Sequence, residues 1–124
     1  MLFVLTATIA KVKLPLILNE MSMKPYRISD TPDPALANLH YDLLDSGAST
    51  PETLSHLASA LSEHEADLSR LREAGCTMTL DCGLNIYEDD MTTSATFNAE
   101  VLSVLARHGA SLTVSVYKTD GARR

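Results

Sequence analysis

A chain of 124 residues with 45% hydrophobic and 21% charged side chains is long enough and apolar enough to bury the core of one globular domain. This composition excludes an intrinsically disordered chain, which combines low hydrophobicity with high net charge. The formal net charge of −6 opposes the cationic contacts on which phosphate-backbone binding depends, so we expect no nucleic-acid partner.

The N-terminal segment has two interpretations. Residues 2–18 are rich in Val, Ile, Leu and Thr and contain Pro15, which favours an edge strand. Alternatively, Met21 or Met23 is the true start, and residues 1–20 do not belong to the native protein. The apolar run lacks the preceding positive charge of a signal peptide and is too short to span a bilayer as a helix, so we expect no membrane segment.

A loop and a short strand are predicted next. The density of backbone breakers between residues 19 and 37, prolines among them, is typical of a long loop. Residues 38–46 then alternate in polarity, with Leu39, Tyr41 and Leu43 on one side. This alternation predicts a strand with one buried face.

The clearest predicted element is a helix from Pro51 to Gly75. Ser49 and Glu52 form a capping-box pattern, proline suits the first helical turn, and glycine suits the left-handed end. An apolar stripe at helical spacing comprises Leu54, Leu57, Leu61, Leu68 and Leu71. The opposite face, predicted to contact solvent, comprises Glu52, Glu63, Asp67, Arg70 and Glu73.

Alternating residues then predict a long strand over positions 76–87, in which every second side chain from Cys76 to Ile86 is apolar. Within such a strand the Cα atoms of Cys76 and Cys82 lie roughly 20 Å apart, too far for a disulfide. Two unpaired thiols among apolar neighbours favour a reducing compartment, and we expect a cytoplasmic location.

The C-terminal third predicts a turn, a helix and a strand. The run Glu88, Asp89 and Asp90 is typical of a solvated turn. Asn98 is a candidate N-cap for a helix ending at Gly109, with Phe97 and Leu102 in hydrophobic-staple positions. A final strand is expected to align three apolar side chains on one face: Leu112, Val114 and Val116.

Together these elements predict an α+β fold. Strands with one apolar face and helices with one apolar stripe are typical of a two-layer sandwich, in which two helices pack on one face of an open, mainly antiparallel sheet. We expect a single domain over residues 21–117 and a flexible tail over residues 118–124.

Residues 38–118 resemble a known family. The strand from His40 to Ser46, the helix from His56 through Leu71, and the closing helix, glycine and strand from Asn98 to Tyr117 carry the resemblance. They are similar to the uncharacterised bacterial four-two-seven-nine family of domains of unknown function. That family has no established activity, so the resemblance implies no catalytic residues.

No motif of metal, nucleophilic or phosphate chemistry occurs in the sequence. The chain lacks the His-x-x-x-His and Cys-x-x-Cys spacings of metal sites, the Gly-x-Ser-x-Gly of hydrolases and a glycine-rich phosphate loop. We therefore expect no metal and no cofactor. His64 falls about 30° from the centre of the leucine stripe, so we expect its ring to face the sheet.

Two function classes remain open, and neither defines the oligomeric state. The first is a non-catalytic binding module, such as an immunity-type inhibitor, whose acidic surface attracts a basic protein. Its candidate contacts are Glu63, Asp67, Glu73, Glu88, Asp89 and Asp90. The alternative is an enzyme or small-ligand domain with a site at the helix–sheet junction near His64, Cys76 and Cys82.

Overall fold

The computed structural model of the protein describes residues 2–45, 50–87 and 95–119. It confirms an α+β fold with an open sheet. In chain order the elements are β1 (Leu2–Ala10), a 3-10 helix η1 (Lys11–Lys13), α1 (Leu14–Glu20), β2 (Arg27–Asp30), β3 (Leu36–Asp45), α2 (Thr50–Glu63), α3 (Glu65–Glu73), β4 (Thr77–Tyr87), α4 (Ala99–Arg107) and β5 (Ser111–Thr119).

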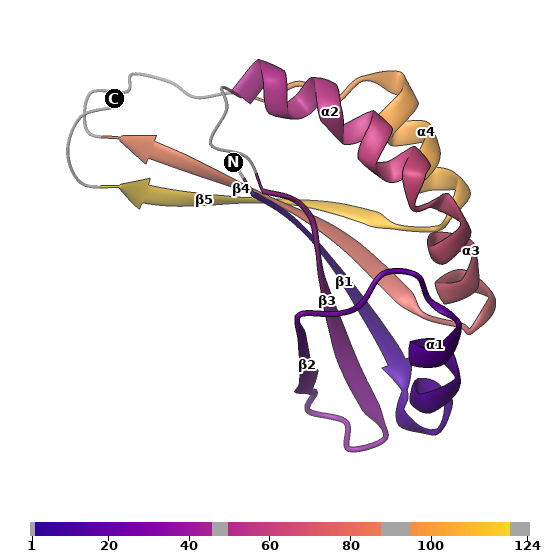
Figure 1. The fold of residues 1–124 in the computed structure, drawn as a ribbon. Coiled ribbons are helices and arrows are strands. Elements are labelled where there is room, and N and C mark those ends of the chain that lie inside the picture. The colour runs from indigo at the N-terminus through magenta and orange to yellow at the C-terminus, as the bar shows by residue number, and fades with distance from the viewer. Residues whose placement is uncertain (1, 46–49, 88–94, 120–124) are drawn as a thin grey trace.

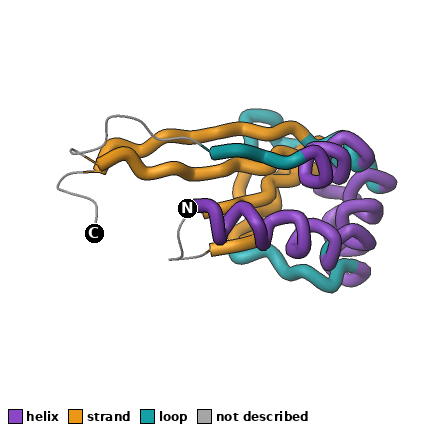
Figure 2. Tube along the Cα trace, turned by 90° about the horizontal axis from the view of Figure 1, so that it is seen from above, coloured by secondary structure: helices purple, strands orange, loops and turns teal. Residues whose placement is uncertain are grey.

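The five strands form one mixed sheet in the order β2-β3-β1-β4-β5. β1 pairs antiparallel with β3 and with β4, and β2 pairs antiparallel with β3. β5 runs parallel to β4 and follows it through α4, because parallel neighbours need a crossover connection. The helices gather along one side of this strongly twisted sheet and leave its other side uncovered (Figures 1 and 2).

The prediction of an edge strand at the N-terminus was wrong, because β1 is the central strand. Its core-facing side chains are at most 1% exposed: Phe3, Leu5, Ala7 and Ile9. The following residues are helical, and Pro15 lies in the first turn of α1, where its missing N–H costs no hydrogen bond. The strand expected to reach residue 18 therefore ends at Ala10, and Ile17 is the one buried residue of α1.

The predicted loop over residues 19–37 contains β2 and the start of β3, so it is shorter than expected. β2 is four residues long and has no periodic signal of its own, since it forms by backbone pairing to β3. The strand predicted at 38–46 is confirmed as β3, with Leu39, Tyr41 and Leu43 buried.

The single helix predicted from Pro51 to Gly75 is two helices, which meet at His64. The break contains no proline or glycine. The His64 N–H donates to the carbonyl of Leu61, three residues earlier, at 3.2 Å, which is the hydrogen-bond spacing of a 3-10 turn rather than of an α-helix. The predicted leucine stripe nevertheless lies in the core, where its buried residues are Leu57, Leu61, Leu68 and Leu71.

The predicted end of the helix is confirmed, because Gly75 follows α3 with a φ of +82°. The predicted contacts of Ser49, Glu52 and Leu54 lie outside the described side chains. Four α-helices, rather than the expected two, therefore occur in the described residues.

The predicted cap of the last helix is confirmed, because Asn98 Oδ1 accepts a hydrogen bond from the Val101 N–H at 2.9 Å. Of the two predicted staple residues, Phe97 packs its ring edge-on against Phe3, with ring centroids 6.4 Å apart, and Leu102 is 47% exposed. β5 continues to Thr119, so the predicted tail begins later than residue 118.

Candidate functional site

Of the predicted acidic surface, the structure describes Glu63, Asp67 and Glu73. Glu63 and Glu73 are exposed on α2 and α3, as the acidic-surface hypothesis requires. Asp67 was wrongly placed on the solvent face, because only 2% of its side chain is exposed. Glu88, Asp89 and Asp90 lie outside the described residues.

Asp67 is a structural carboxylate, and both of its oxygens accept hydrogen bonds. It accepts hydrogen bonds from the backbone N–H groups of Ser22 at 3.0 Å and Met23 at 2.7 Å, and from Arg70 Nη1 at 2.7 Å. Burial by itself raises the pKa of Asp67, but the hydrogen bonds from Met23, Ser22 and Arg70 outweigh it and hold this pKa below its usual range. Asp67 thus fastens the segment after α1 to α3. The Asp–Arg spacing of three residues was the available sequence signal.

None of the three residues of the alternative ligand site lines the hollow that the structure has between α1 and α3. His64 is half-buried at the break between α2 and α3, and Cys76 is half-buried just before β4. Cys82 is fully buried in the middle of β4. Burial raises the pKa of the Cys76 thiol and, with the nearby Asp81, raises the pKa of Cys82 to about 11, which disfavours a nucleophilic thiolate at either position.

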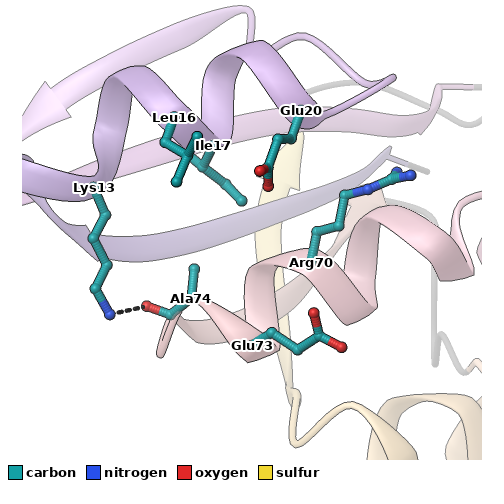
Figure 3. Close-up of a pocket in the computed structure, with 7 residues that line it drawn as sticks. All are labelled: Lys13, Leu16, Ile17, Glu20, Arg70, Glu73 and Ala74. Atoms are coloured by element: carbon teal, nitrogen blue, oxygen red, sulfur yellow. Dashed lines mark hydrogen bonds between the residues drawn. The ribbon is translucent and has the colours of Figure 1, made fainter.

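A hollow of about 250 Å³ lies between α1 and α3 (Figure 3). Its lining comprises Lys13, Leu16, Ile17, Glu20, Arg70, Glu73 and Ala74. Lys13 Nζ donates to the carbonyl of Ala74 at 2.9 Å, and Arg70 is held by Asp67. Both cations of the hollow therefore already bind α3, and the charges of opposite sign around it favour no single class of ligand. We interpret it as the joint between the two helices.

A Ser–His pair lies on the uncovered face of the sheet. Ser29 Oγ and His40 Nε2 are 2.8 Å apart, and the ring of Tyr26 lies 6.1 Å from the ring of His40. A serine nucleophile needs a histidine whose protonated form is stabilised by a carboxylate. Here burial and the nearby Arg27 both lower the pKa of His40, so the charged imidazole is disfavoured. The pair serves as a polar contact that holds β2 to the sheet.

The edge strand β5 has a surface unlike the rest of the molecule. Val114, Val116 and Tyr117 are 46%, 54% and 57% exposed, so three of the large exposed apolar side chains lie within four residues. Within the described part of the chain, β5 pairs only with β4, which leaves its outer backbone edge unpaired. Lys118 is the one charged residue of this nine-residue strand.

The opposite edge of the sheet is protected. β2 has only four residues, and both of its ends are charged, at Arg27 and Asp30. Lys11 Nζ forms an ion pair with Asp30 Oδ1 at 3.3 Å. Short length and charge are devices that prevent further strand pairing, whereas β5 has nine residues and a single charge, Lys118, next to its C-terminal end. Val114 and Val116 were predicted to lie on the apolar face of the last strand, without any expectation that this face is exposed; the available signal was an apolar strand at the end of the fold.

Comparison with known proteins finds no matching family model, no matching curated protein and no matching solved structure. Among the helices of the described residues, none has the length and apolar character required to cross a membrane.

Proposed function

We propose that this protein is a non-catalytic module that binds a protein partner by adding the partner's strand to β5. The exposed edge of β5 carries this proposal. Its free backbone groups would supply the ladder of hydrogen bonds, and its apolar side chains would pack against alternate residues of the added strand, as in other strand-addition complexes. Val114 and Val116 are neighbours on one face of β5, and exposed apolar side chains that lie together are typical of interaction sites.

The acidic charge has a supporting role in this proposal. A net charge of −6, with Glu63 and Glu73 exposed on the helical layer, would steer a basic partner and raise its association rate more than its final affinity. An immunity-type inhibitor is one function of this class. Cytoplasmic location, supported by the two unpaired cysteines, and membership of the four-two-seven-nine family remain parts of the proposal.

Affinity capture from the native cell, read by mass spectrometry, tests the binding site. We compare the unaltered chain with Val116→Lys, which places a charge on the edge strand, and with Val12→Lys, a control at a side chain that is 88% exposed on η1. A lysine on an edge strand opposes pairing. We expect Val116→Lys to lose a protein that the other two chains retain; retention of every captured protein by Val116→Lys would contradict the proposal.

A further inference from the structure

We infer that the strand added to β5 is β5 of a second copy of this chain, antiparallel to the first across a twofold axis at Ser115. This inference rests on the proposed function, because it identifies the partner that uses the β5 edge. A twofold interface requires a surface that is complementary to itself. The sequence of β5 has this property.

The register that pairs the whole of Ser111–Thr119 with itself places Ser115 opposite Ser115 of the second copy. In that register Val114 lies opposite Val116, and Thr113 lies opposite Tyr117, on both sides of the axis. Pairs of β-branched residues and pairs of an aromatic with a β-branched residue stabilise adjacent strands. The order Val-Ser-Val around Ser115 is therefore the same when reversed, and the flanking positions pair Thr113 with Tyr117, a self-complementarity that binding to an unrelated strand does not require.

A second β5 in this register would also continue the apolar face of the sheet. Val114 and Val116 are in register with Cys82 and Leu84 of β4, which are buried on the helix-covered side. Adding a second β5 would bring the four half-exposed valines together and continue that apolar layer.

On the uncovered side, the Tyr117 ring occupies the space above Gly83, where an added Cβ would approach Tyr117 Cε2 to 3.3 Å. Ser115 Oγ donates to Asp81 Oδ1 at 2.9 Å. These contacts hold the polar face of the strand against β4 and leave its outer edge available for pairing.

The charges of β5 itself do not oppose this pairing. Two copies that each carry a net charge of −6 repel one another. β5 has no acidic residue, and the antiparallel register places its single charge, Lys118, opposite Leu112 of the second copy. The pairing therefore brings no carboxylate of β5 against another.

Sedimentation equilibrium over a wide concentration range tests the dimer. We expect the unaltered chain and Val12→Lys to show the same monomer–dimer equilibrium, and Val116→Lys to dimerise roughly tenfold more weakly or worse. Thermal unfolding of Val116→Lys reports whether that variant is folded. A monomer at all concentrations for the unaltered chain would overturn the inference.

Cross-linking of Ser115→Cys tests the register without altering the valines. A cysteine at the twofold axis faces its own copy and should form a disulfide-linked dimer under mild oxidation, faster than Thr113→Cys, which faces Tyr117. The unaltered chain measures any contribution of Cys76 and Cys82. Equal rates for the two variants would overturn the register. If the chain is monomeric but Val116→Lys loses a different captured protein, only the dimer fails; if neither effect occurs, the proposed function fails as well.

Discussion

At the scale of single residues, one buried carboxylate connects two parts of the chain that are far apart in sequence. Asp67 on α3 holds the backbone of Ser22 and Met23, the segment that leads from α1 to β2. Arg70 neutralises the charge from the solvent side. A charged group with several donors and one counter-ion is stable in a buried position, whereas the same group without them is strongly destabilising.

Asp67→Asn removes the charge from this cluster. We expect it to lower the free energy of unfolding by about 1.5–3 kcal/mol at neutral pH, the range for a hydrogen bond that involves a charged group. The exposed Glu73→Gln on the same helix is the control and should change stability by no more than about 0.5 kcal/mol. Urea denaturation of the three chains measures the difference; equal losses for both variants would contradict a special role for Asp67.

The stability difference between the unaltered chain and Asp67→Asn has a predictable pH dependence. The pKa of Asp67 is lower in the folded state than in the unfolded state, so its contribution is complete above the unfolded pKa and is lost as pH falls through the folded pKa. The stability difference between the unaltered chain and Asp67→Asn should therefore shrink in acid, below the usual range of a carboxyl pKa.

At the scale of elements, the leucine stripe functions across a break in the helix. α2 and α3 change direction at His64 (Figure 1), yet the side chains of Leu61 before the break and Leu68 after it are at most 1% exposed. The twisted sheet beneath them curves, and two shorter helices follow that curve better than one straight helix.

Leu61→Ala tests how firmly this layer is packed. Because Leu61 is fully buried, we expect a loss of about 2–5 kcal/mol of unfolding free energy. Leu102→Ala on α4, at a half-exposed position, should cost about 0.5 kcal/mol or less. Thermal or urea unfolding measures both, and a loss at Leu61 as small as that at Leu102 would show that the stripe is not part of the core.

At the scale of the whole molecule, the sheet is organised around its first strand. β1 pairs along both of its edges, with β3 and with β4, and so joins the β2–β3 half of the sheet to the β4–β5 half. Leu5, near its middle, is fully buried between those neighbours. The alternative start at Met21 would remove this strand together with α1.

A chain that starts at Met21 is therefore expected to be unfolded. Its remaining strands would have no common neighbour, and the backbone groups of β3 and β4 that bind β1 would be left unpaired. Circular dichroism and amide hydrogen exchange, with the full chain as reference, measure the outcome. A cooperative unfolding transition in the shortened chain would show that residues 1–20 are dispensable.

The sequence by itself determined the elements whose signals are local. The period-two alternation from Met78 to Leu84, the Asn98 cap and the left-handed end at Gly75 depend on a few neighbouring residues, and each was predicted correctly. The α+β class followed from the order of those elements.

The tertiary structure decided which strand is central, which carboxylate is buried and which edge is exposed. Central and edge strands have the same period of two, so the place of β1 became visible only through its pairing on both sides. Asp67 resembled a surface acid because its backbone donors lie 44 and 45 residues away. Val116 resembled a core residue because apolar character does not reveal whether a partner element covers it, and that depends on the position of β5 at the end of the sheet.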